Sequence, residues 1–166
     1  VTINGLFAGV RNLTFTNTST GVTSTVIWVG SASAADGATN NTISNCIIIG
    51  TSNTFACIMQ SSGVTVGNQA EVANSNNTYN SNLVHSGFNG IAVNGPAAGN
   101  ELSTTITNNT VGSTTPAQKF GLKAIQLINQ QNMVIADNTI RGVNAQGINT
   151  TNQGSGIDVR GIISGG

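Results

Sequence analysis

The sequence has little charge and few aromatic residues, and these shortages exclude several classes of protein. Only 6% of its 166 residues are charged, and five lysines and arginines balance five acids. Without a basic excess, we expect no contact with nucleic acid. No apolar run reaches the ~20 residues of a membrane-spanning helix, so we expect no membrane insertion. Disordered chains combine high charge with low hydrophobicity, whereas 38% of this chain is hydrophobic.

Cysteine is also scarce, because the chain has only Cys46 and Cys57. Two cysteines are too few for a disulfide scaffold. We expect two buried free thiols, and the alternative is a single bridge across a narrow core, since both residues lie in one predicted coil. Neither cysteine has a metal-binding spacing with His85, the lone histidine, so the sequence predicts no metal or other cofactor.

Small uncharged polar residues dominate instead, with 24 Asn, 22 Thr, 21 Gly and 15 Ser. All four are poor helix formers, so long helices are not expected. Short strands joined by frequent turns fit this composition better.

A six-residue motif recurs about every 30 residues. It has apolar first and last positions, a small polar third position and a variable fourth position. The copies are Val10–Phe15, Ile43–Ile48, Tyr79–Val84, Ile106–Val111 and Ile135–Ile140. A second apolar strand follows each copy, at Val26–Val29, Phe55–Met59, Gly90–Val93, Gly121–Ile125 and Gly156–Val159, and a weaker third strand is predicted at Val64–Val66.

A steady motif with irregular spacing is typical of a solenoid, whose strands stack in register while its loops vary in length. A hairpin meander would need tight two-residue turns, but Asn-Gly pairs such as Asn89–Gly90 and Asn94–Gly95 are few. The sequence therefore predicts an all-β, right-handed, single-stranded parallel β-helix of about five coils. We expect residues 1–166 to form one such domain, cut from a longer chain.

The fourth motif position holds Leu13, Cys46, Asn82, Asn109 and Asn138. If coils stack about 4.8 Å apart, the last three amides lie above one another and can hydrogen-bond as a ladder. Asparagine also tolerates the left-handed backbone of a sharp bend, which we place at this position.

These five segments resemble the repeats of right-handed parallel β-helix proteins, the superfold of pectate lyases and of many bacterial surface proteins. The resemblance covers roughly residues 10–163 and implies the fold. It leaves function open, because this superfold includes enzymes, adhesins and fibre proteins.

The enzymes of this superfold impose requirements that the sequence does not meet. Lyases of acidic sugars need a base and usually Ca²⁺ held by several carboxylates, and hydrolases need two carboxylates that flank the scissile bond. The five acids are scattered along the chain: Asp36, Glu71, Glu101, Asp137 and Asp158. Only Asp137 and Asp158 fall in strand-like segments. The Asn-Thr-Asp, Asp-Asp and Gly-His-Gly elements of polygalacturonases are missing. We therefore expect no catalysis, and we interpret His85 as a surface or turn residue.

Four of the five cations fall in the last third of the chain: Lys119, Lys123, Arg141 and Arg160. They are interpreted either as surface ion-pair partners of Asp137 and Asp158 or as contacts in a shallow groove for an acidic glycan. Ice binding needs a flat array of Thr-x-Thr segments. Thr14–Thr16 and Thr105–Thr107 are such segments, but they hold different motif positions, so this function is not expected.

The expected function is that of a secreted or cell-surface structural or adhesive segment, which could bind glycans or copies of itself. A polysaccharide-binding or lyase-like β-helix, whose active groove lies at the edge of this segment or outside it, is the first alternative. A phage or filament component is the second. An enzyme would gather acids and bases in one groove, whereas a structural segment would leave them dispersed.

Overall fold

The computed structural model describes residues 1–97, 101–143 and 154–161. These residues form three five-stranded parallel sheets, which we number in the order in which the chain visits them. Sheet 1 contains β1 (Thr2–Asn4), β6 (Thr42–Ser44), β9 (Thr78–Asn80), β13 (Thr105–Thr107) and β17 (Val134–Ala136). Sheet 2 contains β4 (Leu13–Thr16), β7 (Cys46–Ile49), β10 (Leu83–His85), β14 (Thr110–Gly112) and β18 (Thr139–Arg141). Sheet 3 contains β5 (Thr25–Gly30), β8 (Ala56–Ser61), β11 (Asn89–Asn94), β15 (Lys123–Ile128) and β19 (Ser155–Arg160).

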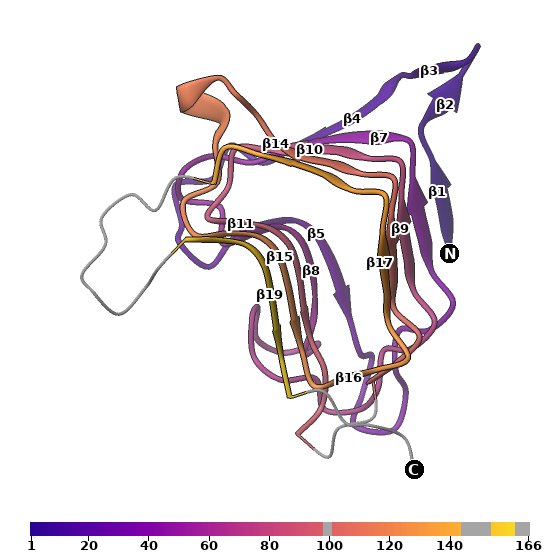
Figure 1. Cartoon of the computed structure of the whole chain (residues 1–166). Helices are drawn as coiled ribbons and strands as arrows, with labels where there is room; N and C mark the ends of the chain where they lie inside the picture. The colour runs from indigo at the N-terminus through magenta and orange to yellow at the C-terminus, as the bar shows by residue number, and fades with distance from the viewer. Residues whose placement is uncertain (98–100, 144–153, 162–166) are drawn as a thin grey trace.

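The chain passes from sheet 1 to sheet 2 to sheet 3 and then returns to sheet 1, so that successive turns stack along one axis (Figure 1). The five-stranded sheets correspond to about four complete turns and confirm the predicted parallel β-helix. Two short pairs, β12 (Glu101–Leu102) with β16 (Gln130–Gln131) and β2 (Leu6–Phe7) with β3 (Val10–Arg11), and one 3-10 turn η1 (Pro116–Gln118) complete the described structure. Its residues include no helix long and apolar enough to cross a membrane.

Each later copy of the motif forms two strands rather than one, because the chain bends sharply at the third position. Asn45, Ser81, Asn108 and Asp137 hold this position with φ of 54°, 56°, 56° and 55°. Residues with short polar side chains tolerate this left-handed conformation better than most. Our placement of the bend at the fourth position was therefore wrong by one residue.

The first motif copy was assigned to the wrong residues. Ile3, not Val10, pairs with Ile43 in sheet 1. Val10 lies in the antiparallel β2–β3 hairpin, which interrupts the motif between sheets 1 and 2 and extends outside the outline of the stack (Figure 1). The chain rejoins the expected register at Leu13, which pairs with Cys46. A local pattern cannot reveal such an insertion, because Val10 is followed by a polar residue just as Ile3 is.

The predicted second strands are confirmed as β5, β8, β11, β15 and β19, with bounds that shift by up to three residues. The weaker strand at Val64–Val66 is wrong, because these residues form a loop in which Val64 is 82% exposed. Val66 instead packs on the outer side of sheet 3, against a small cluster of Ala56, Met59 and Ala92.

The core consists of inward columns that follow the strand register. In sheet 1, Ile43, Tyr79, Ile106 and Ile135 stack in this order, as the sequence predicted. Parallel columns run through sheet 2 (Phe15, Ile48, Val84, Val111 and Ile140) and sheet 3 (Ile27, Ile58, Ile91, Ile125 and Ile157). Each fully buried aliphatic side chain stabilises the fold by about 1.5–3 kcal/mol relative to exposure. Cys46 and Cys57 are buried and free, so the bridge is not formed.

Candidate functional site

Three asparagines hydrogen-bond from turn to turn at the bend between sheets 1 and 2. Asn82 Nδ2 donates to Asn109 Oδ1 at 3.1 Å, and Asn109 Nδ2 donates to Asn138 Oδ1 at 2.9 Å. The backbone N–H groups of Cys46, Asn82 and Asn109 each donate to the amide oxygen of the next turn. Asn82 and Asn109 are almost fully buried. This column therefore satisfies polar groups inside the bend and holds the turns in register, without offering a site to a ligand.

The acids occupy separate environments. Glu71 lies in the loop that follows β8 and accepts hydrogen bonds from Ser31, from Ser62 and from the N–H of Gly63. Those hydrogen bonds, first the one from Ser31, lower the pKa of Glu71 to about 2. Asp137 occupies a left-handed bend, not the strand-like position that the sequence indicated. Neither carboxylate lies in a cluster of metal-binding side chains within the described residues.

Glu101 is the only acid buried in the interior of the described structure, where it belongs to a polar network between sheets 3 and 1. It lies in β12, a strand that the sequence did not predict, and is fully inaccessible. The N–H of Asn74 donates to Oε2 at 2.9 Å, and Gln60 Nε2 donates to Oε1. Gln60 in turn accepts a 2.6 Å hydrogen bond from the hydroxyl of Tyr79. Burial raises the pKa of Glu101, although both hydrogen bonds to its carboxylate oppose that shift.

The outer face of sheet 3 is concave, because its strands bend toward the interior of the β-helix (Figure 1). On β8 and β11 this face is apolar and covered: Met59 and Ala92 are buried, and Phe55 packs against them. The same outward column continues as Gln126 in β15 and Asp158 in β19. Polar side chains therefore replace the apolar ones on this face in the last two turns.

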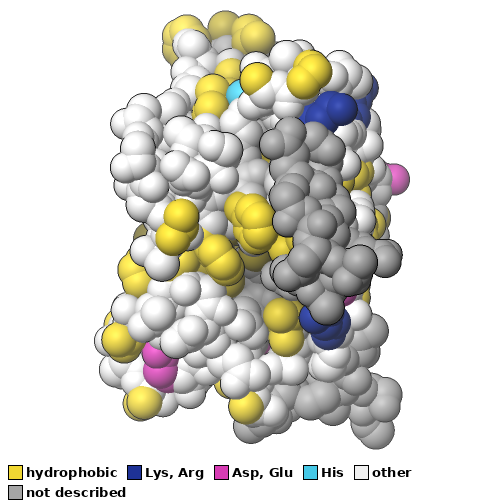
Figure 2. All heavy atoms as spheres, turned by 90° about the vertical axis from the view of Figure 1, so that its left-hand side faces the viewer, with side chains coloured by type: hydrophobic (Ala, Val, Ile, Leu, Met, Phe, Trp, Pro, Cys, Tyr) yellow, Lys and Arg dark blue, Asp and Glu magenta, His cyan; other side chains and the backbone are white. Residues whose placement is uncertain are grey.

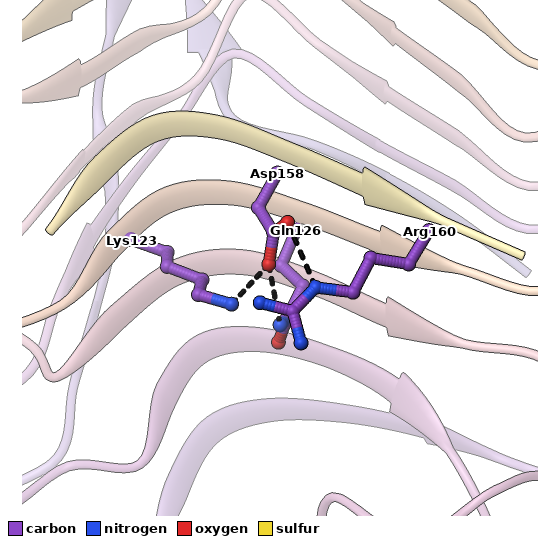
Figure 3. A network of polar contacts seen from close by, with 4 residues as sticks. All are labelled: Lys123, Gln126, Asp158 and Arg160. Atoms are coloured by element: carbon purple, nitrogen blue, oxygen red, sulfur yellow. Dashed lines mark hydrogen bonds and ion pairs between the residues drawn. The ribbon is translucent and has the colours of Figure 1, made fainter. Parts of the chain in front are cut away.

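Three side chains converge on the carboxylate of Asp158 there (Figure 3). Lys123 Nζ forms an ion pair with Oδ2, Gln126 Nε2 donates to Oδ2 at 3.2 Å, and Arg160 Nε donates to Oδ1 at 3.0 Å. The side chains of Lys123 and Asp158 are 8% and 15% exposed, whereas that of Arg160 is 63% exposed. We call Lys123, Gln126, Asp158 and Arg160 the sheet 3 cluster.

The sheet 3 cluster carries two cationic groups and one carboxylate. Burial alone would raise the pKa of Asp158, but the hydrogen bonds from Lys123, Arg160 and Gln126, with the charge of Lys123, lower it. Asp158 is therefore ionised at neutral pH, and the cluster keeps one net positive charge. The exposed Arg160 guanidinium has five N–H donors in a fixed plane, of which Nε–H binds Asp158. Such a group suits carboxylates and hydroxyls of a ligand.

The other two cations of the predicted set do not join this cluster. Lys119 lines a separate pocket of about 350 Å³ beside η1, together with Phe88 and Phe120, and Arg141 ends β18 in sheet 2. In Figure 2 the dark blue Lys and Arg side chains of this flank form two separate groups. The structure thus brings together Lys123 and Arg160 only.

The histidine shows no sign of a catalytic arrangement in the part of the chain that is described. His85 Nδ1 lies 2.8 Å from the hydroxyl of Ser86, the next residue. Burial lowers the pKa of His85. No described acid makes a hydrogen bond or an ion pair with its ring, so no described carboxylate orients the histidine as a general base.

Sequence reasoning missed two features of the outer surface. It did not include Gln126, which becomes a partner of Asp158 only when β15 and β19 pair in register. It also missed a threonine column on the outer side of sheet 1, formed by Thr2, Thr42, Thr78 and Thr105. Both features could be found only by comparing the residues that occupy the same position in successive turns. Comparisons with protein families, curated proteins and solved structures found no match for this chain.

Proposed function

We propose that this chain is a non-catalytic adhesive segment of a secreted or cell-surface protein, and that it binds acidic glycans through the sheet 3 cluster. The observation that carries the proposal is the convergence of Lys123, Gln126, Asp158 and Arg160 on one concave face. The superfold that the repeats resemble includes adhesins, so the fold is compatible with this proposal.

The chemistry of the cluster favours an anionic, hydroxyl-rich ligand. Its net positive charge attracts a carboxylate, and Arg160 presents donors in the planar arrangement that carboxylates match. The buried ion pair with Asp158 fixes the Lys123 side chain, so this part of the cluster is ordered before a ligand arrives. Because Lys123 is bound to Asp158, it supplies local charge rather than a free base.

The distribution of acids supports binding without cleavage. Asp158 is the only carboxylate in the cluster among the described residues, and it is held by three donors. Glu71 and Glu101 are committed to other hydrogen bonds. A hydrolase needs two carboxylates at one bond, and a Ca²⁺-dependent lyase needs several around the ion.

Calorimetric titration with oligogalacturonate and oligomannuronate, and with neutral dextran as control, tests the proposal. We expect the acidic oligosaccharides to bind with an affinity that falls at high salt, because the attraction is electrostatic. Arg160→Gln should weaken binding at least fivefold. The matched variant Arg141→Gln, which removes a cation outside the cluster, should leave it unchanged. Equal loss in both variants, or no binding to either acidic polymer, would overturn the proposal.

The competing function is a polysaccharide lyase, and the same ligands distinguish it. A lyase would release unsaturated sugars on prolonged incubation, with a rate that depends on Lys123 or Arg160. We expect the oligosaccharides to be recovered intact. Reproducible unsaturated products that disappear in Lys123→Met would replace binding with catalysis as the function.

A further inference from the structure

The β2–β3 hairpin extends outward from the corner between sheets 1 and 2 and carries exposed apolar side chains (Figure 1). Leu6 is 49% exposed, Phe7 is 71% exposed and Val10 is 64% exposed. Residues directly opposite each other in an antiparallel pair share one face. Leu6 and Arg11 therefore lie on one face of the hairpin, and Phe7 and Val10 lie on the other. Only the face of Leu6 and Arg11 has a charge.

A groove of about 390 Å³, which we call the hairpin groove, lies between this hairpin and the outer face of sheet 2. Its lining includes two hairpin residues and four residues from the second and third turns: Leu6, Arg11, Asn45, Ile47, Ser81 and Leu83. The strands beneath it, β7 and β10, each pair with a neighbour on both sides. The groove therefore belongs to the side of the stack and not to either end. Its volume is typical of small-ligand sites, which span about 300–1,000 Å³.

The floor of the hairpin groove is apolar only where the hairpin stands beside it. Ile47 and Leu83 are half-buried neighbours in one outward column of sheet 2. In the other turns this column holds threonine, at Thr14, Thr110 and Thr139. Leu6 is 49% exposed, so the hairpin does not close over the two aliphatic side chains of the floor. These three side chains therefore offer an accessible apolar surface to an aliphatic group.

Arg11 supplies the charge of the hairpin groove. Its Nε donates to the carbonyl oxygen of Ser81 at 2.6 Å, so the side chain reaches past the second turn to the third. This hydrogen bond ties the hairpin to the stack and orients the guanidinium plane. No described acid forms an ion pair with Arg11. A guanidinium has five N–H donors, so donors remain for an anionic ligand after Nε–H has bound Ser81.

We propose that the hairpin groove binds the C-terminus of a partner peptide whose last residue is aliphatic. Arg11 pairs with the terminal carboxylate, whose planar shape a guanidinium matches, and the apolar floor contacts the aliphatic side chain. A peptide is favoured over a fatty acid, because Asn45 and Ser81 line the groove with polar groups that suit backbone amides. The sheet 3 cluster lies on another sheet, so glycan binding and peptide binding can each fail without the other.

Fluorescence anisotropy with a synthetic peptide tests the proposal on the whole chain. The probe is Gly-Ser-Gly-Val-Leu with a dye at its amino end, prepared once with a free terminal carboxylate and once with a terminal amide. We expect the free carboxylate to bind at least fivefold more tightly than the amide, with an affinity that falls at high salt. Octanoate, which has the carboxylate and the alkyl chain without the amides, should not displace the peptide at equal concentration.

Three variants separate the parts of the hairpin groove. Arg11→Gln should weaken binding of the free carboxylate at least fivefold, to the level of the amide. Because this variant also removes the hydrogen bond to Ser81, Leu83→Thr gives a second test that leaves that bond in place and installs the residue found one turn later at Thr110. We expect Leu83→Thr to weaken binding at least fivefold with unchanged circular dichroism. Phe7→Ser, on the other face of the hairpin, should bind like the unmodified chain.

Four results would overturn the proposal. Equal affinity for the carboxylate and the amide would show that Arg11 does not recognise the terminus. Equal affinity of Leu83→Thr and Phe7→Ser would place the peptide outside the groove. Full displacement by octanoate at equal concentration would make the ligand a fatty acid, and no binding of the peptide at millimolar concentration would leave the groove without this function.

Discussion

Asn82 and Asn109 lie one turn apart, and the amide of Asn82 donates to the amide oxygen of Asn109 at 3.1 Å. The same oxygen accepts the backbone N–H of Asn82 at 2.9 Å. One side chain thus satisfies two donors of the turn before it, in a bend from which water is excluded. The ladder is therefore a property of the stack and not of any one turn.

Replacing Asn109 by leucine should destabilise the fold by about 1–3 kcal/mol, because two donors of Asn82 lose their buried acceptor. Urea denaturation followed by circular dichroism measures this change. Asn53→Leu is the matched control, since Asn53 is exposed in a turn. Equal urea midpoints for the two variants would show that the ladder does not stabilise the fold.

The left-handed bend at Ser81 predicts opposite effects for two substitutions. Its φ of 56° is unfavourable for a β-branched residue, whereas glycine adopts it without steric cost. Ser81→Val should lower the free energy of unfolding by about 1–2 kcal/mol, and Ser81→Gly should leave it unchanged or raise it. Thr105→Val, in the extended strand β13, should change it little. A tolerated valine at position 81 would contradict the bend.

Glu101 should make the stability depend on pH. Burial raises its folded-state pKa above the unfolded value of 4.5, so the folded chain holds the proton more tightly. The contribution of Glu101 is therefore most favourable below pH 4.5 and declines as pH rises toward the folded pKa. In Glu101→Gln, melting temperatures measured in steps upward from pH 4.5 should lose this decline. Glu71→Gln should retain it, because the pKa of Glu71 lies lower, at about 2. A decline that persists in Glu101→Gln would assign it to another group.

Asp158 should matter for stability as well as for ligands. Asp158→Ala leaves the nearly buried Lys123 ammonium without its partner, which should destabilise the fold by about 1–3 kcal/mol. The double variant Asp158→Ala with Lys123→Met removes the charge as well and should recover most of that loss. Thermal denaturation of both variants checks this. A double variant no more stable than the single one would show that the two side chains do not depend on each other.

The sequence predicted the stack well because its signal is repeated. Ile43, Ile106 and Ile135 recur at the same motif position, and a column of apolar residues is what in-register stacking requires. The prediction that placed Val10 at the first motif position was wrong for the opposite reason, because it relied on a single copy. Val10 matched the motif locally, but only the position of the hairpin relative to Ile3 and Leu13 decides which residue enters the sheet.

The candidate site was predicted only in part, since it depends on which outward positions share a column. Lys119 and Arg141 looked equivalent to Lys123 and Arg160 in the sequence, but they lie on other elements. Lys123 and Arg160 converge because β15 and β19 are paired neighbouring strands and both side chains bind Asp158. The pairing of strands from successive turns leaves no mark in the local order of polar and apolar residues.

The most direct test of the proposed function is to locate the ligand on the chain. Amide signals of isotopically labelled protein can be followed by NMR during titration with an acidic oligosaccharide. We expect shifts in β15 and β19, centred on Gln126 and Asp158, with the oligosaccharide intact at the end. Shifts confined to the pocket of Lys119 and Phe88, or no shifts at saturating ligand, would contradict it.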